Sequence, residues 1–454
     1  MSGMLFAIAA FVLALGVLIT VHEFGHYWVA RRAGVKVLRF SIGFGRPLWT
    51  HRFGPDRTEF VLAAVPLGGY VKMLDEREGP VPTGELQRAF NRKPVGQRMA
   101  VVIAGPAFNF LFAILAYWAL FVYGVPGVKP MLDVPVATGL AAQSGIEAGD
   151  LLLSVDGKPT PTWDRAILAL LDGALDRKRL RLEVQDATGD QRVVHLDLTE
   201  AEGLLERGDL LEHLGLRPWR PPLPPVIDEV IEAGAAARAG MQAGDRILRA
   251  DGEPMTDWDT WVGYVQARPD QTIRVEIERG EVTMELSVRP ERAEDATGAV
   301  GRIGAYVRVP PAVGEELRTE TRYGPLVALQ QGAIKTWDMS ALTLRTLWKM
   351  LLGDASLDNI SGPISIAQYA GHTASIGLGT FLNFLAIVSI SLGVLNLLPV
   401  PILDGGHLMY YLIEFVKGSP VSERTEMFGQ RIGIALLFAL MSLALFNDFT
   451  RLLG

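Results

Sequence analysis

The side chains of His22, Glu23 and His26 form the pattern H-E-x-x-H near the N-terminus of a chain of 454 residues. This pattern on a helix is typical of zinc hydrolases, because histidines four residues apart lie on one helical face and can bind one metal ion. A glutamate between them can reach a metal-bound water and act as a general base. The spacing therefore predicts a hydrolytic site with His22 and His26 as metal ligands and Glu23 as the base.

The pattern follows an uncharged apolar run from Met4 to Val21, which is about as long as a membrane helix must be. A chance H-E-x-x-H on an ordinary helix is the alternative. That alternative gives no reason for a glutamate and two histidines to lie at the boundary of a bilayer, where ionisable residues are costly and usually functional. We therefore predict a metal site in or beside a membrane.

Four segments are predicted to span the membrane. They are Met4 to Val21, Met99 to Tyr123, Phe381 to Leu398, and Ile432 to Phe446. The first lacks the basic leader of a cleavable signal peptide. The sequence contains no cysteine, so any metal must be bound by His, Asp or Glu. The net charge of −7 argues against nucleic acid as a partner.

The charges between the spans predict the orientation of the chain. Residues 27–98 carry 13 Lys and Arg against 6 Asp and Glu, whereas residues 124–379 carry 26 against 38. The positive-inside rule places the basic segment in the cytoplasm and the acidic segment outside, in the periplasm of a Gram-negative bacterium. Both termini are then periplasmic. A helix from Met4 would carry His22 about 27 Å, close to the cytoplasmic face.

Two histidines leave a catalytic zinc site one protein ligand short. His195, His213 and His372 fall in the region predicted outside, and His51 lies in the basic loop. These four histidines are therefore weak candidates for the third ligand.

Asp404 is the better candidate, because it follows Pro399 and Pro401 at about the depth of His22. Two prolines break a helix, and broken backbone at membrane depth is tolerated where it is buried or lines a water-filled cavity. The alternative is that Asp404 only caps a helix that begins at Gly405 or Gly406. The nearby Asn396 favours the catalytic interpretation, since its amide could donate to a developing oxyanion.

The two motifs, His22 to His26 and Asn396 to Gly405, resemble the signatures of the site-2 protease family of intramembrane metalloproteases. The resemblance covers nearly the whole chain, with each motif in its expected span and a large insert between the second and third spans. It implies Zn²⁺ bound by His22, His26 and Asp404, Glu23 as the catalytic base, and a substrate- or oxyanion-stabilising role for Asn396.

The resemblance also implies a substrate class and a location. Substrates would be single-pass transmembrane proteins, namely an anti-sigma factor after a first periplasmic cut and the remnants of signal peptides. The setting would be regulated intramembrane proteolysis in an envelope stress response, at the bacterial inner membrane.

The acidic insert contains an internal repeat, Gly145 to Gly157 and Gly240 to Gly252, with copies 95 residues apart. Each copy has G-x-x-A-G-D, an alternating strand and an Asp-Gly pair typical of a tight turn, which together resemble the core of bacterial PDZ domains. Such domains bind extended peptides or peptide C-termini by adding a strand. The alternative role is a spacer or size filter over the active site.

The proline-rich segment 217–225 is predicted to be a stiff linker between the copies.

Three other segments carry weaker signals. The glycine-rich parts of the basic loop lack the spacing of phosphate-binding loops and are predicted to form turns of a membrane-associated hairpin. The family resemblance implies that an edge strand of this loop holds the substrate. Tyr323 to Leu352 has the pattern of an interfacial amphipathic helix. Asn359 to Ile366 matches a family motif whose role the sequence does not reveal.

We therefore expect a polytopic α-helical membrane protein with four transmembrane helices, two extracytoplasmic α+β PDZ domains, and a membrane-associated β-hairpin or sheet. The predicted division of the chain is a first transmembrane helix with H-E-x-x-H (1–35), a cytoplasmic β region (36–98), a second transmembrane helix (99–123), two PDZ domains (124–220 and 221–310), an amphipathic helix and linker (311–380), a third transmembrane segment (381–415), and a loop with the fourth helix (416–454).

The expected function is that of an intramembrane zinc endopeptidase. The alternative is a non-catalytic, membrane-anchored tandem-PDZ peptide receptor. A metal-dependent transporter is disfavoured, because four spans with one ligand cluster contain no inverted repeat.

Overall fold

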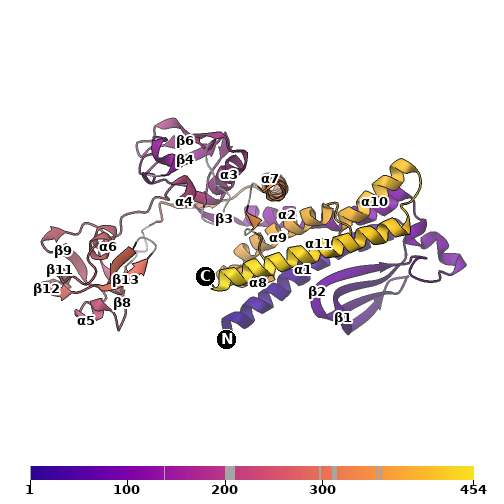
Figure 1. Cartoon of the computed structure of the whole chain (residues 1–454), viewed down its shortest axis with the longest axis horizontal. Coiled ribbons are helices and arrows are strands. Elements are labelled where there is room, and N and C mark those ends of the chain that lie inside the picture. The colour runs from indigo at the N-terminus through magenta and orange to yellow at the C-terminus, as the bar shows by residue number, and fades with distance from the viewer. Residues whose placement is uncertain are drawn as a thin grey trace.

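The computed structural model describes residues 2–137, 139–199, 210–295, 298–308, 314–353, 356–357 and 360–453. The molecule is elongated, with a helical bundle that carries a small β-sheet at one end and two α+β units at the other (Figure 1). The helices of the bundle and its flanks are α1 Ser2–Arg32, α2 Val95–Tyr123, α7 Pro325–Leu352, α8 Pro363–Ile376, α9 Leu378–Leu397, α10 Asp404–Lys417 and α11 Glu423–Leu453.

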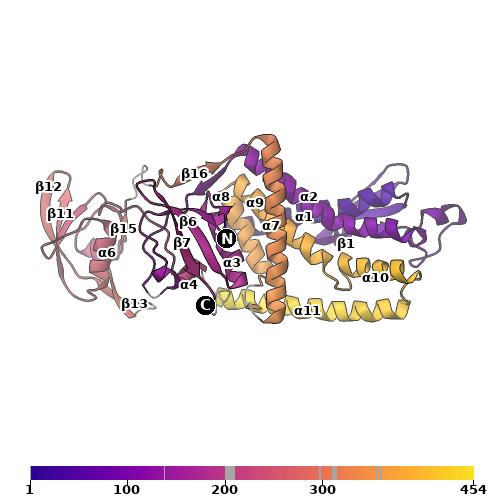
Figure 2. The ribbon, with the colours of Figure 1, turned by 90° about the horizontal axis from the view of Figure 1, so that it is seen from above.

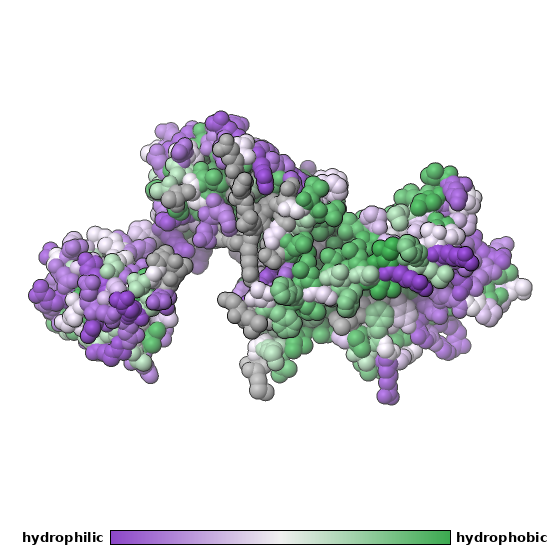
Figure 3. Space-filling model, viewed as in Figure 1, coloured by the Kyte–Doolittle hydropathy of each residue, from purple (hydrophilic) through white to green (hydrophobic). Residues whose placement is uncertain are grey.

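Four of these helices, α1, α2, α9 and α11, are long and apolar enough to cross a membrane, as predicted. Their exposed apolar side chains form a belt between two polar ends (Figure 3). The first and fourth helices extend beyond the apolar runs that predict the spans. α1 continues past Val21 to Arg32, and α11 begins at Glu423 rather than Ile432. Helical hydrogen bonds are satisfied within the chain, so a helix does not have to end where its apolar run ends.

α2 lies at the centre of the bundle and contacts α1, α7, α9 and α10. Small residues allow the close approach of α1 and α2: a Cβ on Gly25 would lie 2.3 Å from the Ala104 carbonyl oxygen. Within a membrane the lipid tails are as apolar as the side chains, so burying apolar surface between two helices contributes little to their association. Close van der Waals packing is then a major source of that association. This packing brings the H-E-x-x-H face of α1 against α2.

The basic loop forms a folded hairpin of β1 Val37–Phe53 and β2 Thr58–Met73, followed by the 3-10 helices η1 Thr83–Arg88 and η2 Phe90–Arg92. The N-terminal part of β1 pairs with two different stretches of β2, one along each of its sides. Ser41 is the partner of Val61 and also of Tyr70. Bends at glycines with positive φ, such as Gly43 and Gly68, make this double pairing possible. Residues 69–73 therefore form an edge of the sheet.

The two copies of the repeat fold into units with the same strand order, β5-β4-β6-β7 and β10-β9-β11-β12. The first contains η3 Leu140–Gln143, β4 Leu151–Val155, β5 Lys158–Pro159, α3 Trp163–Asp176, β6 Arg179–Gln185, β7 Gln191–Asp197 and α4 Leu210–Leu214. The second contains β8 Ile227–Val230, α5 Ala235–Arg238, β9 Arg246–Ala250, β10 Glu253–Pro254, α6 Trp258–Gln266, β11 Ile273–Arg279, β12 Val282–Val288, β13 Glu291–Asp295, β14 Gly298–Arg302 and β15 Ala305–Val307. Each has its own buried apolar core.

The shared motif has a structural role in both units. The aspartate of G-x-x-A-G-D is buried, with Asp150 1% exposed and Asp245 0% exposed. Asp245 accepts a hydrogen bond from the backbone N–H of Gln242 and pairs with Arg279. Asp150 makes the equivalent contacts in the first unit. The Asp-Gly pairs have positive φ at both residues and form the predicted tight turns.

The insert is joined to the bundle by a short sheet in which β3 Val125–Val128 pairs with β16 Arg318–Thr321. α7 then runs across the bundle axis (Figure 2). The Asp448 carboxylate of α11 caps the following helix, α8, by accepting hydrogen bonds from the backbone N–H groups of Gly362, Ile364 and Ser365. This contact gives the second half of the Asn359 to Ile366 motif a structural role. Asn359 itself lies outside the described residues.

Candidate metal centre

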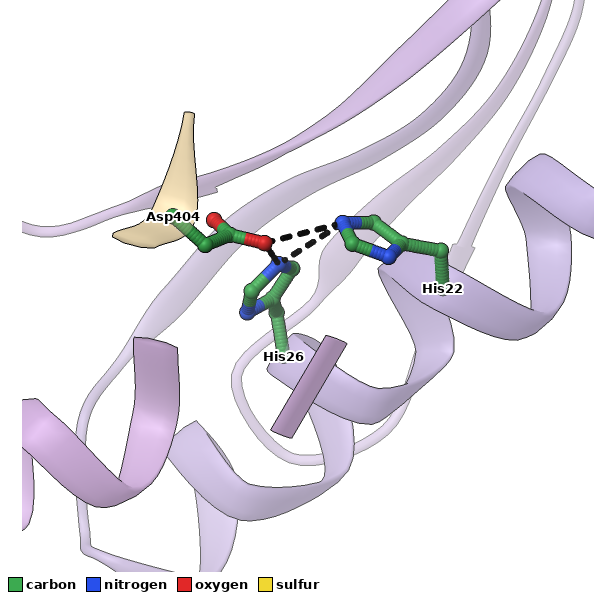
Figure 4. Close-up of side chains that lie close together, drawn as sticks. All are labelled: His22, His26 and Asp404. Atoms are coloured by element: carbon green, nitrogen blue, oxygen red, sulfur yellow. Dashed lines mark hydrogen bonds and ion pairs between the residues drawn. The ribbon is translucent and has the colours of Figure 1, made fainter. Parts of the chain in front are cut away.

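His22, His26 and Asp404 meet at one point, although Asp404 is nearly 400 residues away along the chain (Figure 4). The Asp404 Oδ2 atom lies 3.2 Å from His22 Nε2 and 3.5 Å from His26 Nε2. The two Nε2 atoms are 3.2 Å apart. The histidines come from consecutive turns of α1, and Asp404 is the first residue of α10, directly after the proline-broken segment.

The three donor atoms fit a zinc ion. Ligands at about 2.0 to 2.1 Å from a tetrahedral ion are separated by about 3.3 Å, and the three observed separations bracket this value. Asp404 Oδ2 is also buried and accepts no hydrogen bond of normal geometry from the described residues. Two imidazoles and one carboxylate are a common protein ligand set for catalytic zinc.

The capping alternative for Asp404 does not match the structure. The helix begins at Asp404 itself, one residue earlier than predicted, and its N-cap is Leu403. No side chain makes a capping hydrogen bond there. The carboxylate points toward the histidines instead (Figure 4).

Residues of α2 contact the Nδ1 atom of each imidazole ring, whereas the Nε2 atoms face Asp404. His26 Nδ1 lies 2.8 Å from the Val101 carbonyl oxygen, to which it can donate, leaving the Nε2 lone pair for a metal. Asn109 Nδ2 lies 3.1 Å from His22 Nδ1, and the Asn109 Oδ1 atom is buried without a hydrogen-bond partner among the described residues. Metal binding through His22 Nε2 requires a proton on Nδ1, and a 180° rotation of the Asn109 amide would bring Oδ1 to this place as the acceptor.

Gly105 of α2 packs directly against the two histidine side chains. A Cβ on Gly105 would lie 2.4 Å from His26 Nε2 and 2.7 Å from His22 Cε1. We did not predict Gly105 or Asn109 as functional residues. The available signal was Asn109 itself, a polar residue inside a predicted membrane span.

A salt bridge fixes α10, and with it Asp404, to the rest of the bundle. Both terminal guanidinium nitrogens of Arg98 on α2 donate to the Glu414 carboxylate on α10, at 2.5 and 3.0 Å. The same guanidinium lies over the Tyr411 ring at 4.8 Å. Bidentate pairs of this kind give directional as well as electrostatic stabilisation.

The donor atoms open into a cavity of about 770 Å³. Glu23 and Asn396 both line this cavity, as does His407. The Asn396 side chain makes no hydrogen bond to any described residue, so its amide is free to bind a ligand. The sheet edge at residues 69–73 forms another wall, and Gly69 comes so close that a Cβ on it would lie 3.0 Å from Glu23 Cγ.

The chain matches the model of Peptidase family M50 over residues 10–440. It is 47% identical over 454 residues to the regulator of sigma-E protease RseP of Escherichia coli K12, with both chains fully covered. The chain belongs to Peptidase family M50. This membership confirms the resemblance to the site-2 proteases, identifies the protein as an intramembrane zinc metalloprotease, and supports the enzyme rather than the peptide-receptor alternative.

Other relatives are also named as proteases. The chain is 48% identical to the regulator of sigma E protease of Salmonella typhi over 455 residues, again with both chains fully covered. It is 42% identical over 457 residues, with the same coverage, to a putative zinc metalloprotease of Vibrio cholerae. Among solved structures, the PDZ domain of an SdrC-like protein (Lmo2051) from Listeria monocytogenes matches 18% of this M50 chain and 84% of its own, at 22% identity and a TM-score of 0.16.

Proposed function

We propose that this M50 protease cleaves single-pass membrane proteins at a zinc ion held by His22, His26 and Asp404. The observation that carries the assignment is the convergence of their three donor atoms, with Asp404 Oδ2 buried between the imidazoles. Zinc at this position would lower the pKa of a bound water toward 7 and polarise the scissile carbonyl.

The remaining chemistry belongs to Glu23 and Asn396. Glu23 takes the proton from the attacking water and passes it to the leaving amine. Asn396, whose amide is unpartnered in the same cavity, donates to the carbonyl oxygen as this atom gains negative charge. Val101 and Asn109 hold the two imidazoles in the tautomer that binds metal.

The substrate is proposed to bind as an added strand along residues 69–73. A helical peptide bond is shielded by its own hydrogen bonds, so a membrane helix must unwind before water can attack it. The edge pairs with β1 on one side only and lines the catalytic cavity on the other. Its unpaired backbone groups can therefore hold an extended peptide beside Glu23.

We further propose an anti-sigma factor, after a first cut outside, and signal-peptide remnants as substrates at a bacterial inner membrane. The names of the relatives, regulators of sigma-E protease, support the first of these. The two repeat units are proposed to be periplasmic PDZ domains that bind peptide C-termini or exclude large ectodomains. The net charges of the loops support this orientation.

The metal assignment is tested by the zinc content of the purified full chain and of three variants. We expect about one zinc per wild-type chain and its loss in His22→Ala and in Asp404→Ala. His51→Ala is the matched control, since His51 is exposed on the β-sheet and should leave the zinc in place. Zinc-free wild-type protein, or full zinc in Asp404→Ala, would contradict the assignment.

The role of Glu23 is tested by cleavage of a model transmembrane substrate. Glu23→Gln should keep its zinc but lose at least about 10³-fold in turnover, because the general base is removed. The same variant should retain bound substrate, which crosslinking to residues 69–73 would locate. Near-normal turnover by Glu23→Gln would sink this mechanism.

A further inference from the structure

A second cavity, of about 630 Å³, lies between the first repeat unit and α7. Its walls are α3 and the β4–β5 turn on one side and α7 on the other. α3 and α7 lie side by side in both views of the ribbon (Figures 1 and 2). None of its lining residues belongs to the metal centre, so the proposed protease chemistry leaves this cavity without a role.

The charged residues that line the cavity are predominantly basic. Four are cations and two are anions: Lys158, Arg165, Lys335, Arg345, Asp172 and Asp338. Asp172 is already paired with Lys158 and with Arg345. Among the described residues, neither Arg165 nor Lys335 has an ion-pair partner. Arg345 is also paired with Asp176. Arg165 and Lys335 are therefore the two cations left for a ligand, against the one further lining carboxylate, that of Asp338.

Lys335 lies in an apolar setting. Its ammonium group is 4.5 Å from the centre of the Tyr117 ring and 5.8 Å from that of Phe121, both on α2. Burial and the nearby Arg165 lower the pKa of Lys335 to about 8, and Asp164 opposes this only in part. The Tyr117 hydroxyl beneath it is buried and has no hydrogen-bond partner among the described residues. An anion in the cavity would relieve the desolvation of this charge.

The cavity lies beside the end of the apolar belt, where we place the membrane surface. α7 crosses the bundle at the end of its apolar belt (Figures 2 and 3). Trp118 of α2 donates from Nε1 to the Pro325 carbonyl oxygen at the start of α7. Outside the cavity, α7 exposes an apolar stripe that includes Trp337, Leu344 and Trp348, as helices that lie in the headgroup region do.

The walls of the cavity are also suited to a ligand with an apolar part. Leu168 of α3 and Ile334, Met339 and Leu342 of α7 line it beside the two cations. A soluble anion would use only the charged residues, whereas a phospholipid would use both. The excess of positive charge disfavours a zwitterionic headgroup, because Arg165 and Lys335 would repel its ammonium group.

We propose that this cavity binds the phosphate of an anionic phospholipid from the leaflet on the side of the repeat units. Arg165 and Lys335 bind the phosphate, and the apolar walls contact the glycerol and the start of the acyl chains. The bound lipid bridges the first repeat unit to α7. Because α7 packs on α2, which carries Gly105 and Asn109, the site connects a membrane lipid to the helix that supports the metal centre.

The proposal is tested by native mass spectrometry of the full chain in a neutral detergent, titrated with palmitoyl-oleoyl phosphatidylglycerol. We expect one tightly bound lipid per chain, and at least about tenfold weaker binding of the phosphatidylcholine analogue. The double variant Arg165→Gln, Lys335→Gln should weaken phosphatidylglycerol binding about tenfold or more, since it removes two charged hydrogen-bond donors. Lys349→Gln, a change on the same helix but outside the cavity, should leave binding unchanged.

A second variant separates a specific site from a general loss of folding. Ala341→Phe keeps both cations but narrows the cavity, and it should also weaken lipid binding while the variant retains wild-type zinc content. Equal binding of phosphatidylglycerol by wild type and the double variant would overturn the proposal. So would competition by inorganic phosphate or by an acidic peptide at the concentrations that displace the lipid, because the site would then recognise a soluble anion.

Discussion

At the scale of single residues, the proposed metal centre depends on groups that would not touch the metal. Each histidine presents Nε2 to the centre because its Nδ1 is engaged by α2, through Val101 for His26 and Asn109 for His22. Such partners set the tautomer and the ring orientation, and their loss typically lowers metal affinity 10- to 100-fold.

Replacing Asn109 should therefore weaken zinc binding without unfolding the protein. In Asn109→Ala, His22 loses its Nδ1 acceptor, and we expect zinc affinity to fall roughly 10- to 100-fold in competition with a chelator. Asn109→Asp keeps an acceptor oxygen at the same place and should retain most of the affinity. Wild-type affinity in Asn109→Ala would show that the amide does not orient His22.

The buried aspartates of the repeat motif provide a prediction about stability. Asp245 is 0% exposed and paired with Arg279, so Asp245→Asn should destabilise the second unit by about 2 kcal/mol. Limited proteolysis of the full chain would show this as faster cleavage within residues 221–308.

The matched control for this change is Asp228→Asn in the same unit. Asp228 is 58% exposed and pairs with Arg308 at 3.4 Å, and a surface pair of this kind contributes less than about 1 kcal/mol. Similar cleavage rates for the two variants would contradict a structural role for the motif aspartate.

At the scale of elements, the site depends on helices that are fixed to one another by buried or partly buried polar contacts. Arg98 joins α2 to α10 through Glu414, and Asp448 joins α11 to the start of α8. In an apolar environment these contacts are directional, whereas apolar packing alone allows helices to slide. Gly362 is part of the second contact, since a Cβ there would lie 2.4 Å from Asp448 Oδ2.

Asp448→Ala should release the N-terminus of α8. The variant leaves three backbone N–H groups without their acceptor, and the loss of a helix cap costs about 1 to 2 kcal/mol. Hydrogen–deuterium exchange of residues 362–366 should become faster by roughly 5- to 30-fold. Thr450→Ala is the control, because the Thr450 hydroxyl donates within α11 to the Phe446 carbonyl oxygen. Unchanged exchange in Asp448→Ala would rule out this cap.

At the scale of the whole molecule, an apolar belt lies between two polar ends (Figure 3). The segment 27–98 at one end is basic, and the segment 124–379 that contains the repeat units is acidic. The folded hairpin, whose residues 69–71 and 73 line the cavity at the histidines, lies at the basic end, and the two repeat units lie at the other (Figure 1). A substrate that enters through the membrane would therefore meet the repeat units and the catalytic centre on opposite sides of the bundle.

This polarity can be tested with single cysteines, since the natural chain has none. Glu281→Cys lies in the exposed turn between β11 and β12, and Ser419→Cys in the exposed turn between α10 and α11. A membrane-impermeant maleimide should label Glu281→Cys in intact spheroplasts and Ser419→Cys only after the membrane is opened. The reverse pattern would invert the proposed topology.

Much of this protein follows from local sequence patterns. The spacing of His22 and His26 places them on one face of any helix. The apolar runs predict the four spans, and the proline-broken segment before Asp404 indicates irregular backbone at membrane depth. The repeat predicts two units of one topology. All of these features are properties of residues close together in the chain, which is why the sequence alone reveals them.

The tertiary structure decided which distant segments meet. Gly105 and Asn109 lie in a span that reads as apolar apart from Asn109 itself. Their contacts with the two histidines appear only when α2 packs against the H-E-x-x-H face of α1. The sheet edge at residues 69–73 and the cavity beside Lys335 likewise arise between elements that are far apart in the chain. A local pattern shows which face of an element is apolar, but the partner of that face is fixed by packing across the whole fold.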